Sequence, residues 1–138
     1  MMFMGRGASI KGRIVCGVGK GAFFTQLGWV KEQCQQKLGF VPYPGTLNLE
    51  IEEDVLSLLG KACEECGHEL VPPDSSSCAG MVVRVQVGDV PAAVVFLDES
   101  VRWHPANTIE IIAPVSLKSV LGAGDGETVE ITLDAIGD

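Results

Sequence analysis

Six short segments rich in β-branched residues, separated by glycine and proline, constrain the fold of this chain most strongly. These predicted strands are Ala8–Cys16, Thr46–Ile51, Gly80–Gly88, Val90–Leu97, Thr108–Ala113 and Thr128–Leu133. Gly88-Asp89 separates two of them and predicts a hairpin. The strands do not alternate regularly with helices, so layered βαβ units are not expected. The sequence therefore predicts a mainly β fold. A small closed barrel is the arrangement that leaves the fewest strand edges exposed.

Two or three short helices are expected between the strands. Gln26–Leu38 has apolar residues at helical spacing, and Gly39 follows as a typical residue for ending a helix. The apolar positions of that helix are Leu27, Val30, Cys34 and Leu38. Glu52–Gly60 predicts a second short helix, and Pro114–Leu121 a third, which Gly122 would end.

The length of 138 residues predicts a single domain, residues 1–138. Lys61–Ala79 contains Pro72-Pro73 and three consecutive serines, and it predicts an irregular excursion on the surface of that domain.

The formal net charge of −8 argues against a nucleic-acid partner, because DNA and RNA binding requires lysine and arginine to neutralise phosphates. No segment approaches the ~20 apolar residues needed to cross a membrane, and the first residues show no signal-peptide pattern. A cytoplasmic location is therefore expected, with the five cysteines as thiols.

A glycine-rich stretch, Cys16–Phe24, follows the first predicted strand with Gly17, Gly19 and Gly21 in alternation. Consecutive backbone N–H groups in such a turn can form a concave nest for phosphate. The alternative is a tight turn or bulge that leaves the strand. The spacing matches neither a Walker A loop nor a Rossmann fingerprint.

Thr46 and Asn48 lie one strand step apart, so their side chains are expected on the same face. Both offer neutral oxygens, which suit a hard cation that a phosphate also binds. The alternative is two solvated polar residues on a half-buried strand. In a later strand Glu110 lies between Ile109 and Ile111 and is expected to face away from them.

The cysteines allow two interpretations. Cys63 and Cys66 have the first-pair spacing of a structural zinc site, with His68 and Cys78 downstream, but the complete pattern matches no known finger. Alternatively, Cys63 and Cys66 lie on the last turn of a helix and face the core.

Three stretches together resemble one family, the archaeal-type CTP-dependent riboflavin kinases. They are Gly12–Phe24 (GRIVCGVGKGAFF), Leu38–Ile51 (LGFVPYPGTLNLEI) and Thr108–Ile131 (TIEIIAPVSLKSVLGAGDGETVEI). The resemblance implies a six-stranded Greek-key barrel of the cradle-loop type. It also implies transfer of the γ-phosphate of CTP to the ribityl 5′-hydroxyl of riboflavin, which gives FMN and CDP.

The resemblance also assigns roles to residues of this chain. Thr46 and Asn48 would hold Mg²⁺, and Glu110 would contact the flavin and orient or deprotonate its hydroxyl. The nucleotide would be bound by Gly17, Val18, Gly19, Lys20, Gly21 and Ala22 and by Val115, Ser116, Leu117 and Lys118.

Two positions depart from the family pattern. Arg102 stands where many members have a threonine that touches the flavin phosphate, although an arginine can also bind a phosphate. Ala22 replaces a residue that is sometimes arginine. The alternative to a kinase is therefore a non-catalytic nucleotide- or flavin-binding module on the same barrel.

Overall fold

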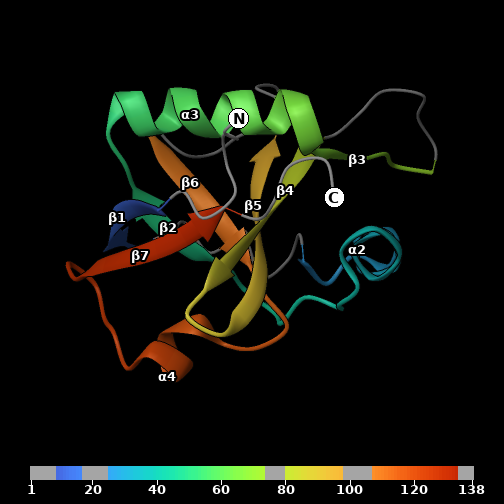
Figure 1. Ribbon diagram of the computed structural model, residues 1–138. Helices are drawn as coiled ribbons and strands as arrows, with labels where there is room; N and C mark the ends of the chain where they lie inside the picture. The colour runs from blue at the N-terminus through green and yellow to red at the C-terminus, as the bar shows by residue number, and fades with distance from the viewer. Residues whose placement is uncertain (1–8, 17–24, 74–79, 98–106, 134–138) are drawn as a thin grey trace.

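In the part of the chain that the structure describes, seven antiparallel strands form one continuous sheet (Figure 1). The structure is a computed structural model, and it describes residues 9–16, 25–73, 80–97 and 107–133. The strands are β1 (Ser9–Val15), β2 (Leu47–Glu50), β3 (His68–Leu70), β4 (Gly80–Val87), β5 (Val90–Leu97), β6 (Thr108–Ile112) and β7 (Thr128–Leu133). Within these ranges three helices accompany the strands: α2 (Gly28–Leu38), α3 (Glu53–Cys66) and α4 (Leu117–Leu121).

The sheet closes into a barrel because β4 pairs with two strands along the same edge. Its start pairs with β3, and its end pairs with β7 through Val85 opposite Leu133. The strand order β4-β5-β6-β2-β1-β7 then returns to β4, with β3 as an additional strand outside the ring. This confirms the predicted mainly β barrel of six strands with short helices; β3 was not predicted from the sequence.

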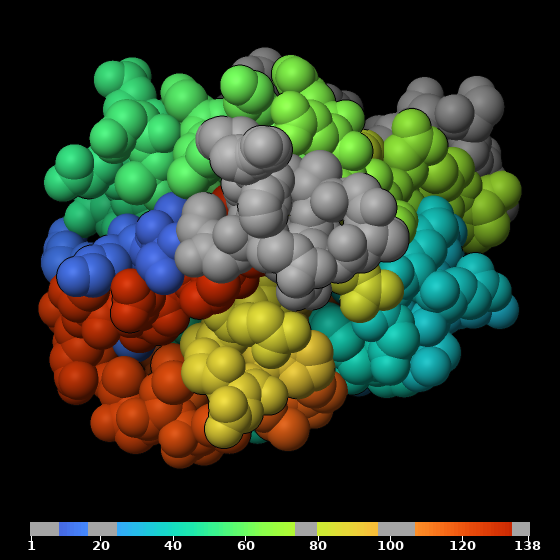
Figure 2. All heavy atoms as spheres, in the orientation of Figure 1, coloured from blue at the N-terminus to red at the C-terminus, as the bar shows by residue number. Residues whose placement is uncertain are grey.

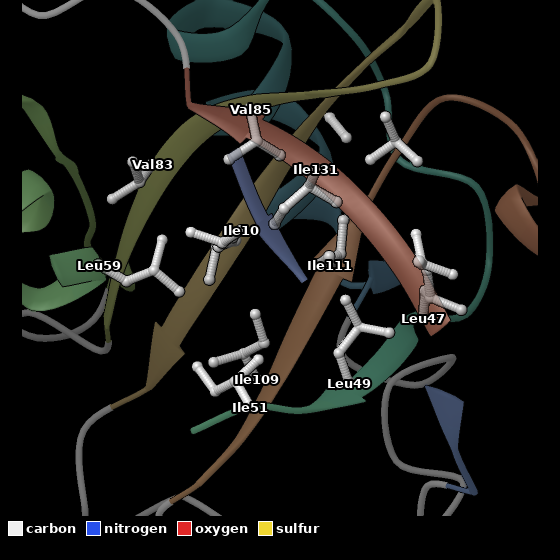
Figure 3. Packing of buried hydrophobic residues seen from close by; sticks show 14 of the residues in the cluster. Ile10, Leu47, Leu49, Ile51, Leu59, Val83, Val85, Ile109, Ile111 and Ile131 are labelled. Atoms are coloured by element: carbon white, nitrogen blue, oxygen red, sulfur yellow. The ribbon is translucent and has the colours of Figure 1, made fainter. Parts of the chain in front are cut away.

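The barrel interior is filled by apolar side chains that alternate along the strands (Figure 3). Figure 3 shows Ile10, Ile111 and Ile131 converging from three different strands, with Leu59 of α3 beside them. Leu47 and Leu49 point into this core, as the alternation predicted. Consequently Asn48, which lies between them, belongs to the outer face of β2.

Helix α2 covers the outer face of β4, β5 and β6. Its residues Val30, Cys34 and Leu38 are buried in a second apolar cluster, at the helical spacing seen in the sequence. Gly39 ends the helix with φ of 85°, the left-handed conformation that glycine adopts without strain. The Arg84 side chain donates to the carbonyl oxygens of Lys37 and Leu38 at 2.9 and 3.2 Å, which fixes this end of the helix to β4.

Helix α3 lies across one end of the barrel (Figures 1 and 2). The prediction that this helix ends at Gly60 was wrong, because it continues to Cys66. Leu59 and Ala62 are buried against the barrel, and burying them outweighs the roughly 1 kcal/mol that glycine costs inside a helix. The predicted irregular excursion at Lys61–Ala79 is therefore wrong up to Leu70, since its first part is helix and β3; residues 74–79 lie outside the described residues.

The C-terminal part of the chain follows the sequence predictions closely. Helix α4 begins after Ser116, whose hydroxyl accepts from the Ser119 N–H at 3.3 Å, and it ends at Gly122 in the left-handed conformation. Pro114 therefore precedes the helix instead of opening it. The hairpin at Gly88-Asp89 is also confirmed, because β4 and β5 pair from Val87 and Val90 onward.

Candidate active site

Polar side chains from β2 and β6 meet on the outer face of the barrel. Asn48 and Glu110 are direct partners in the antiparallel register of these strands. Both are buried, with 9% and 4% of their surface exposed. The Thr46 hydroxyl donates to Asn48 Oδ1 at 3.3 Å, and the same side chain hydrogen-bonds to the Glu110 carboxylate. The three residues singled out in the sequence thus form one cluster, and Thr46 and Asn48 share a face as predicted.

The surroundings of Glu110 are unusual for a carboxylate. On the other side of β6 its register partner is Val95, which packs with Ile112 in the apolar cluster beneath α2. Burial raises the pKa of Glu110 from 4.5 to about 7, although the hydrogen bond from Thr46 opposes this shift. A buried carboxyl group with such a pKa is typical of functional sites.

The turn before Thr46 is fixed by a residue that the sequence reasoning missed. Thr25 is completely buried, and its hydroxyl oxygen accepts a hydrogen bond from the Gly45 N–H at 3.1 Å. Thr25 thereby joins the segment before α2 to the turn that leads into β2. Nothing in the sequence around Thr25 distinguishes it from other threonines, so only the structure could identify it.

A small cavity of about 120 Å³ opens beside Thr46. The Tyr43–Leu47 turn forms one wall, and Val115–Lys118 forms another. The two walls are joined by a hydrogen bond from the Tyr43 N–H to the Ala113 carbonyl oxygen at 2.7 Å. All four residues predicted to border a nucleotide in this part of the chain therefore line one cavity together with Thr46.

Tyr43 and Val115 stand partly exposed at this cavity, with 46% and 40% of their surface accessible. An apolar rim of this kind is common where a flat ring binds.

Lys118 forms an ion pair with Asp125 at 2.9 Å, and both side chains are about half exposed. Such an exposed pair contributes little to stability, so Lys118 can exchange Asp125 for a phosphate at small cost.

Other predicted site residues cannot be placed. Gly17 to Ala22 and Arg102 lie outside the described residues. The structure therefore brings together Thr46, Asn48, Glu110 and Val115–Lys118, and leaves the glycine-rich stretch and the flavin loop as predictions.

The oxygens of Thr46 and Asn48 fit a magnesium ion that also binds phosphate. They are neutral, close to each other and beside a carboxylate, whereas Mg²⁺ takes few protein ligands and completes its shell with water and phosphate oxygens. The described residues contain no group of three or more histidine, cysteine, aspartate or glutamate side chains that could hold a metal by themselves.

Cys63 and Cys66 lie on the last turns of α3 and pack against the barrel core, as the second interpretation of the cysteines predicted. The Cys66 thiol donates to the Ala62 carbonyl oxygen at 3.2 Å. His68 begins β3, and Cys78 lies outside the described residues. None of the four described cysteines is part of a disulfide bond. Among the helices of the described part of the chain, none has the length and apolar character required to span a bilayer.

Comparison with known proteins assigns the chain to a family. The family model CTP-dep_RFKase, described as a domain of unknown function, DUF120, matches residues 14–133. The chain belongs to this CTP-dependent riboflavin kinase family. The match runs from β1 to the end of β7, so it includes the whole Thr46–Asn48–Glu110 cluster and the cavity beside it.

Curated relatives of the family carry the name riboflavin kinase. The protein of Pyrobaculum islandicum is 34% identical over 128 residues, which are 90% of this chain and 59% of the relative. The protein of Methanocella arvoryzae is 36% identical over 125 residues, which are 91% of this chain and 56% of the relative. The chain thus spans somewhat more than half the length of these two relatives. The match to the riboflavin kinase of Methanobrevibacter smithii, at 32% identity, covers 97% of that protein.

Proposed function

We propose that this chain is a CTP-dependent riboflavin kinase, which uses Mg²⁺ to transfer the γ-phosphate of CTP to the 5′-hydroxyl of riboflavin. The observation that carries this proposal is the pair of buried residues Asn48 and Glu110, joined by the half-buried Thr46, next to the cavity lined by Val115–Lys118. Family membership and relatives named riboflavin kinase support the same reaction.

The cluster contains the groups that phosphoryl transfer requires. This reaction depends on positioning and charge neutralisation more than on covalent catalysis. Thr46 and Asn48 would hold Mg²⁺, which supplies positive charge to the phosphates when bound. Val115–Lys118 would border the nucleotide, and the N–H groups of Gly17–Ala22 would bind its phosphates.

Glu110 is the residue that we assign to the acceptor. Its carboxylate would accept a hydrogen bond from the 5′-hydroxyl of riboflavin and take its proton as the hydroxyl oxygen bonds to the γ-phosphorus. The bond between the γ-phosphorus and the bridging oxygen breaks, and CDP leaves. Burial beside Asn48 holds the carboxylate in one place, which favours a single orientation of the hydroxyl.

The reaction is tested by incubating the purified chain with riboflavin, CTP and Mg²⁺ and separating the products by chromatography. We expect FMN and CDP in equal amounts, and no FMN when EDTA is present. The Asn48→Ala variant is expected to form FMN much more slowly, whereas Glu130→Gln, a change on the exposed side of β7, serves as the matched control. If the chain binds CTP and riboflavin but forms no FMN, the kinase assignment is wrong.

A further inference from the structure

The loop between α4 and β7 carries a carboxylate that neutralises a lysine of the candidate nucleotide site. Among the described residues that line the cavity beside Thr46, Lys118 alone carries a charge. Its ammonium group forms an ion pair at 2.9 Å with Asp125, which does not line the cavity. Lys118 belongs to α4, at the end of the barrel opposite α3 (Figure 1). The positive charge at this cavity is therefore balanced from outside it.

The turn that carries Asp125 is fixed to the barrel by its backbone. The Ile14 N–H donates to the Glu127 carbonyl oxygen, and the Gly126 N–H donates to the Ile14 carbonyl oxygen, both at 2.8 Å. Within the turn, the Gly124 N–H donates to Glu127 Oε2 at 3.1 Å. Lysine, by contrast, carries its charge on a flexible four-carbon side chain. When the ion pair opens, the partner that moves is therefore Lys118.

A phosphate in the cavity would compete with Asp125 for the same ammonium group. The side chains of Lys118 and Asp125 are 47% and 55% exposed, so water screens their attraction and the ion pair opens at small cost. Lysine binds phosphate as a point charge, and a nucleotide phosphate chain is more negative than one carboxylate. If both anions contacted Lys118 at once, they would lie close together and repel each other. Lys118 therefore exchanges one anion for the other.

We propose that Asp125 is a competing counter-ion, which holds Lys118 while no nucleotide is bound and lowers the affinity of the chain for nucleotide phosphates. An entering nucleotide takes Lys118 from Asp125, and Asp125 recovers it when the nucleotide leaves. The same ion pair opens for CTP and for CDP, so Asp125 weakens the binding of both and keeps the product from remaining bound. Asp125 acts through Lys118 and is a positioning residue. The inference rests on the proposed function, since it takes CTP and CDP as the ligands.

The test measures the affinity for CDP, and for CTP without riboflavin, by calorimetric titration in the presence of Mg²⁺. Asp125→Asn is compared with the wild type and with the control Glu130→Gln. Glu130 is exposed on β7 opposite Lys11 and does not line the cavity, so its substitution removes the same charge elsewhere. We expect Asp125→Asn to bind both nucleotides roughly twofold to fivefold more tightly, the range for loss of an exposed ion pair. Glu130→Gln should match the wild type.

Two further measurements identify Lys118 as the group through which Asp125 acts. In Lys118→Met, the additional change Asp125→Asn should no longer tighten binding. The gain in the single variant should also disappear in about 1 M NaCl, where charges on exposed side chains are screened within ~3 Å. A structural role of Asp125 in its turn would instead weaken nucleotide binding, with or without Lys118.

The outcomes separate this inference from the kinase assignment. Unchanged or weaker nucleotide binding in Asp125→Asn, or an equal gain without Lys118, would overturn the counter-ion role and leave the kinase in place if the wild type forms FMN. A gain that depends on Lys118, in a chain that forms no FMN, would support the counter-ion role and reject the kinase. A wild-type chain that binds neither nucleotide would overturn both.

Discussion

Asn48 and Glu110 face each other across two neighbouring strands and are buried, although both lie on the outer surface of the barrel. Outward-facing residues of a small barrel are usually solvated, and burying a carboxylate is costly unless it is satisfied by polar partners. The Thr46 hydroxyl supplies one such partner for each of them. Buried polar groups of this kind, with a carboxyl whose pKa is raised by burial, are typical of binding or catalytic sites.

The metal-binding role of Thr46 and Asn48 predicts a specific kinetic change. Thr46→Val keeps the shape of the side chain but removes its oxygen, so the Mg²⁺ concentration for half-maximal rate should rise roughly tenfold to hundredfold. Thr46→Ser keeps the oxygen and should stay close to the wild type. Initial rates at varied Mg²⁺ concentration measure this. Equal Mg²⁺ dependence in Thr46→Val and Thr46→Ser would reject a role for this hydroxyl in holding the metal.

The buried carboxyl of Glu110 predicts how stability changes with pH in metal-free protein. Its pKa is raised from 4.5 to about 7 in the fold, so the folded state binds the proton more tightly than the unfolded chain. The stabilisation of the folded state by this tighter proton binding is complete below pH 4.5 and is lost as the pH rises through about 7. Between pH 4.5 and pH 8 the wild type should lose roughly 2–3 kcal/mol more unfolding free energy than Glu110→Gln, which does not titrate.

Urea unfolding of both proteins in EDTA, at several pH values, measures this difference. At pH 8 Glu110→Gln should be the more stable protein, even though it is expected to be the less active one. Parallel pH profiles for the two proteins would show that Glu110 does not titrate in this range.

Thr25 is predicted to position the turn that carries Thr46. Thr25→Val removes the acceptor of the part-buried Gly45 N–H, which costs roughly 1 kcal/mol of stability. It should also raise the Mg²⁺ requirement, because Thr46 directly follows Gly45. Thr25→Ser, which keeps the hydroxyl, should restore the Mg²⁺ requirement. A loss of stability without any change in Mg²⁺ dependence would limit Thr25 to a structural role.

The described cysteines should differ in their reactivity. Cys34 is completely buried on the inner face of α2, and burial raises its pKa to about 11, so almost no thiolate forms at pH 8. Cys16 is exposed at the end of β1. Iodoacetamide at pH 8 should label Cys16 within minutes and spare Cys34 until the protein is unfolded in urea, as peptide mass spectrometry can show. Equal labelling of the two in native protein would contradict the packing of α2.

Much of the fold could be predicted because local patterns decided it. The alternation in β2 and the spacing of Val30, Cys34 and Leu38 in α2 are direct consequences of which faces are buried. The end of α3 could not be predicted, because Gly60 and Lys61 interrupt the apolar pattern and only contact with the barrel shows that Ala62 is buried. Strand β3 has only three residues and depends on pairing with β4.

The candidate site was predictable where its residues lie close together in sequence. Thr46 and Asn48 share a strand, so their common face follows from the pleat. Their contact with Glu110 depends on the pairing of β2 with β6, and the alternation of apolar residues along each strand does not specify which strands pair. Thr25 was missed, because its hydrogen bond with Gly45 depends on contact between distant segments.

The central claim is that the γ-phosphate of CTP is transferred to riboflavin at the Asn48–Glu110 pair. The most direct measurement uses CTP or ATP labelled at the γ-phosphate and follows the label into FMN, in the wild type and in Glu110→Gln. We predict rapid labelling of FMN from CTP, little from ATP, and a rate with CTP that falls at least roughly a hundredfold in Glu110→Gln. If no label enters FMN with either nucleotide, or if Glu110→Gln keeps full activity, the central claim is contradicted.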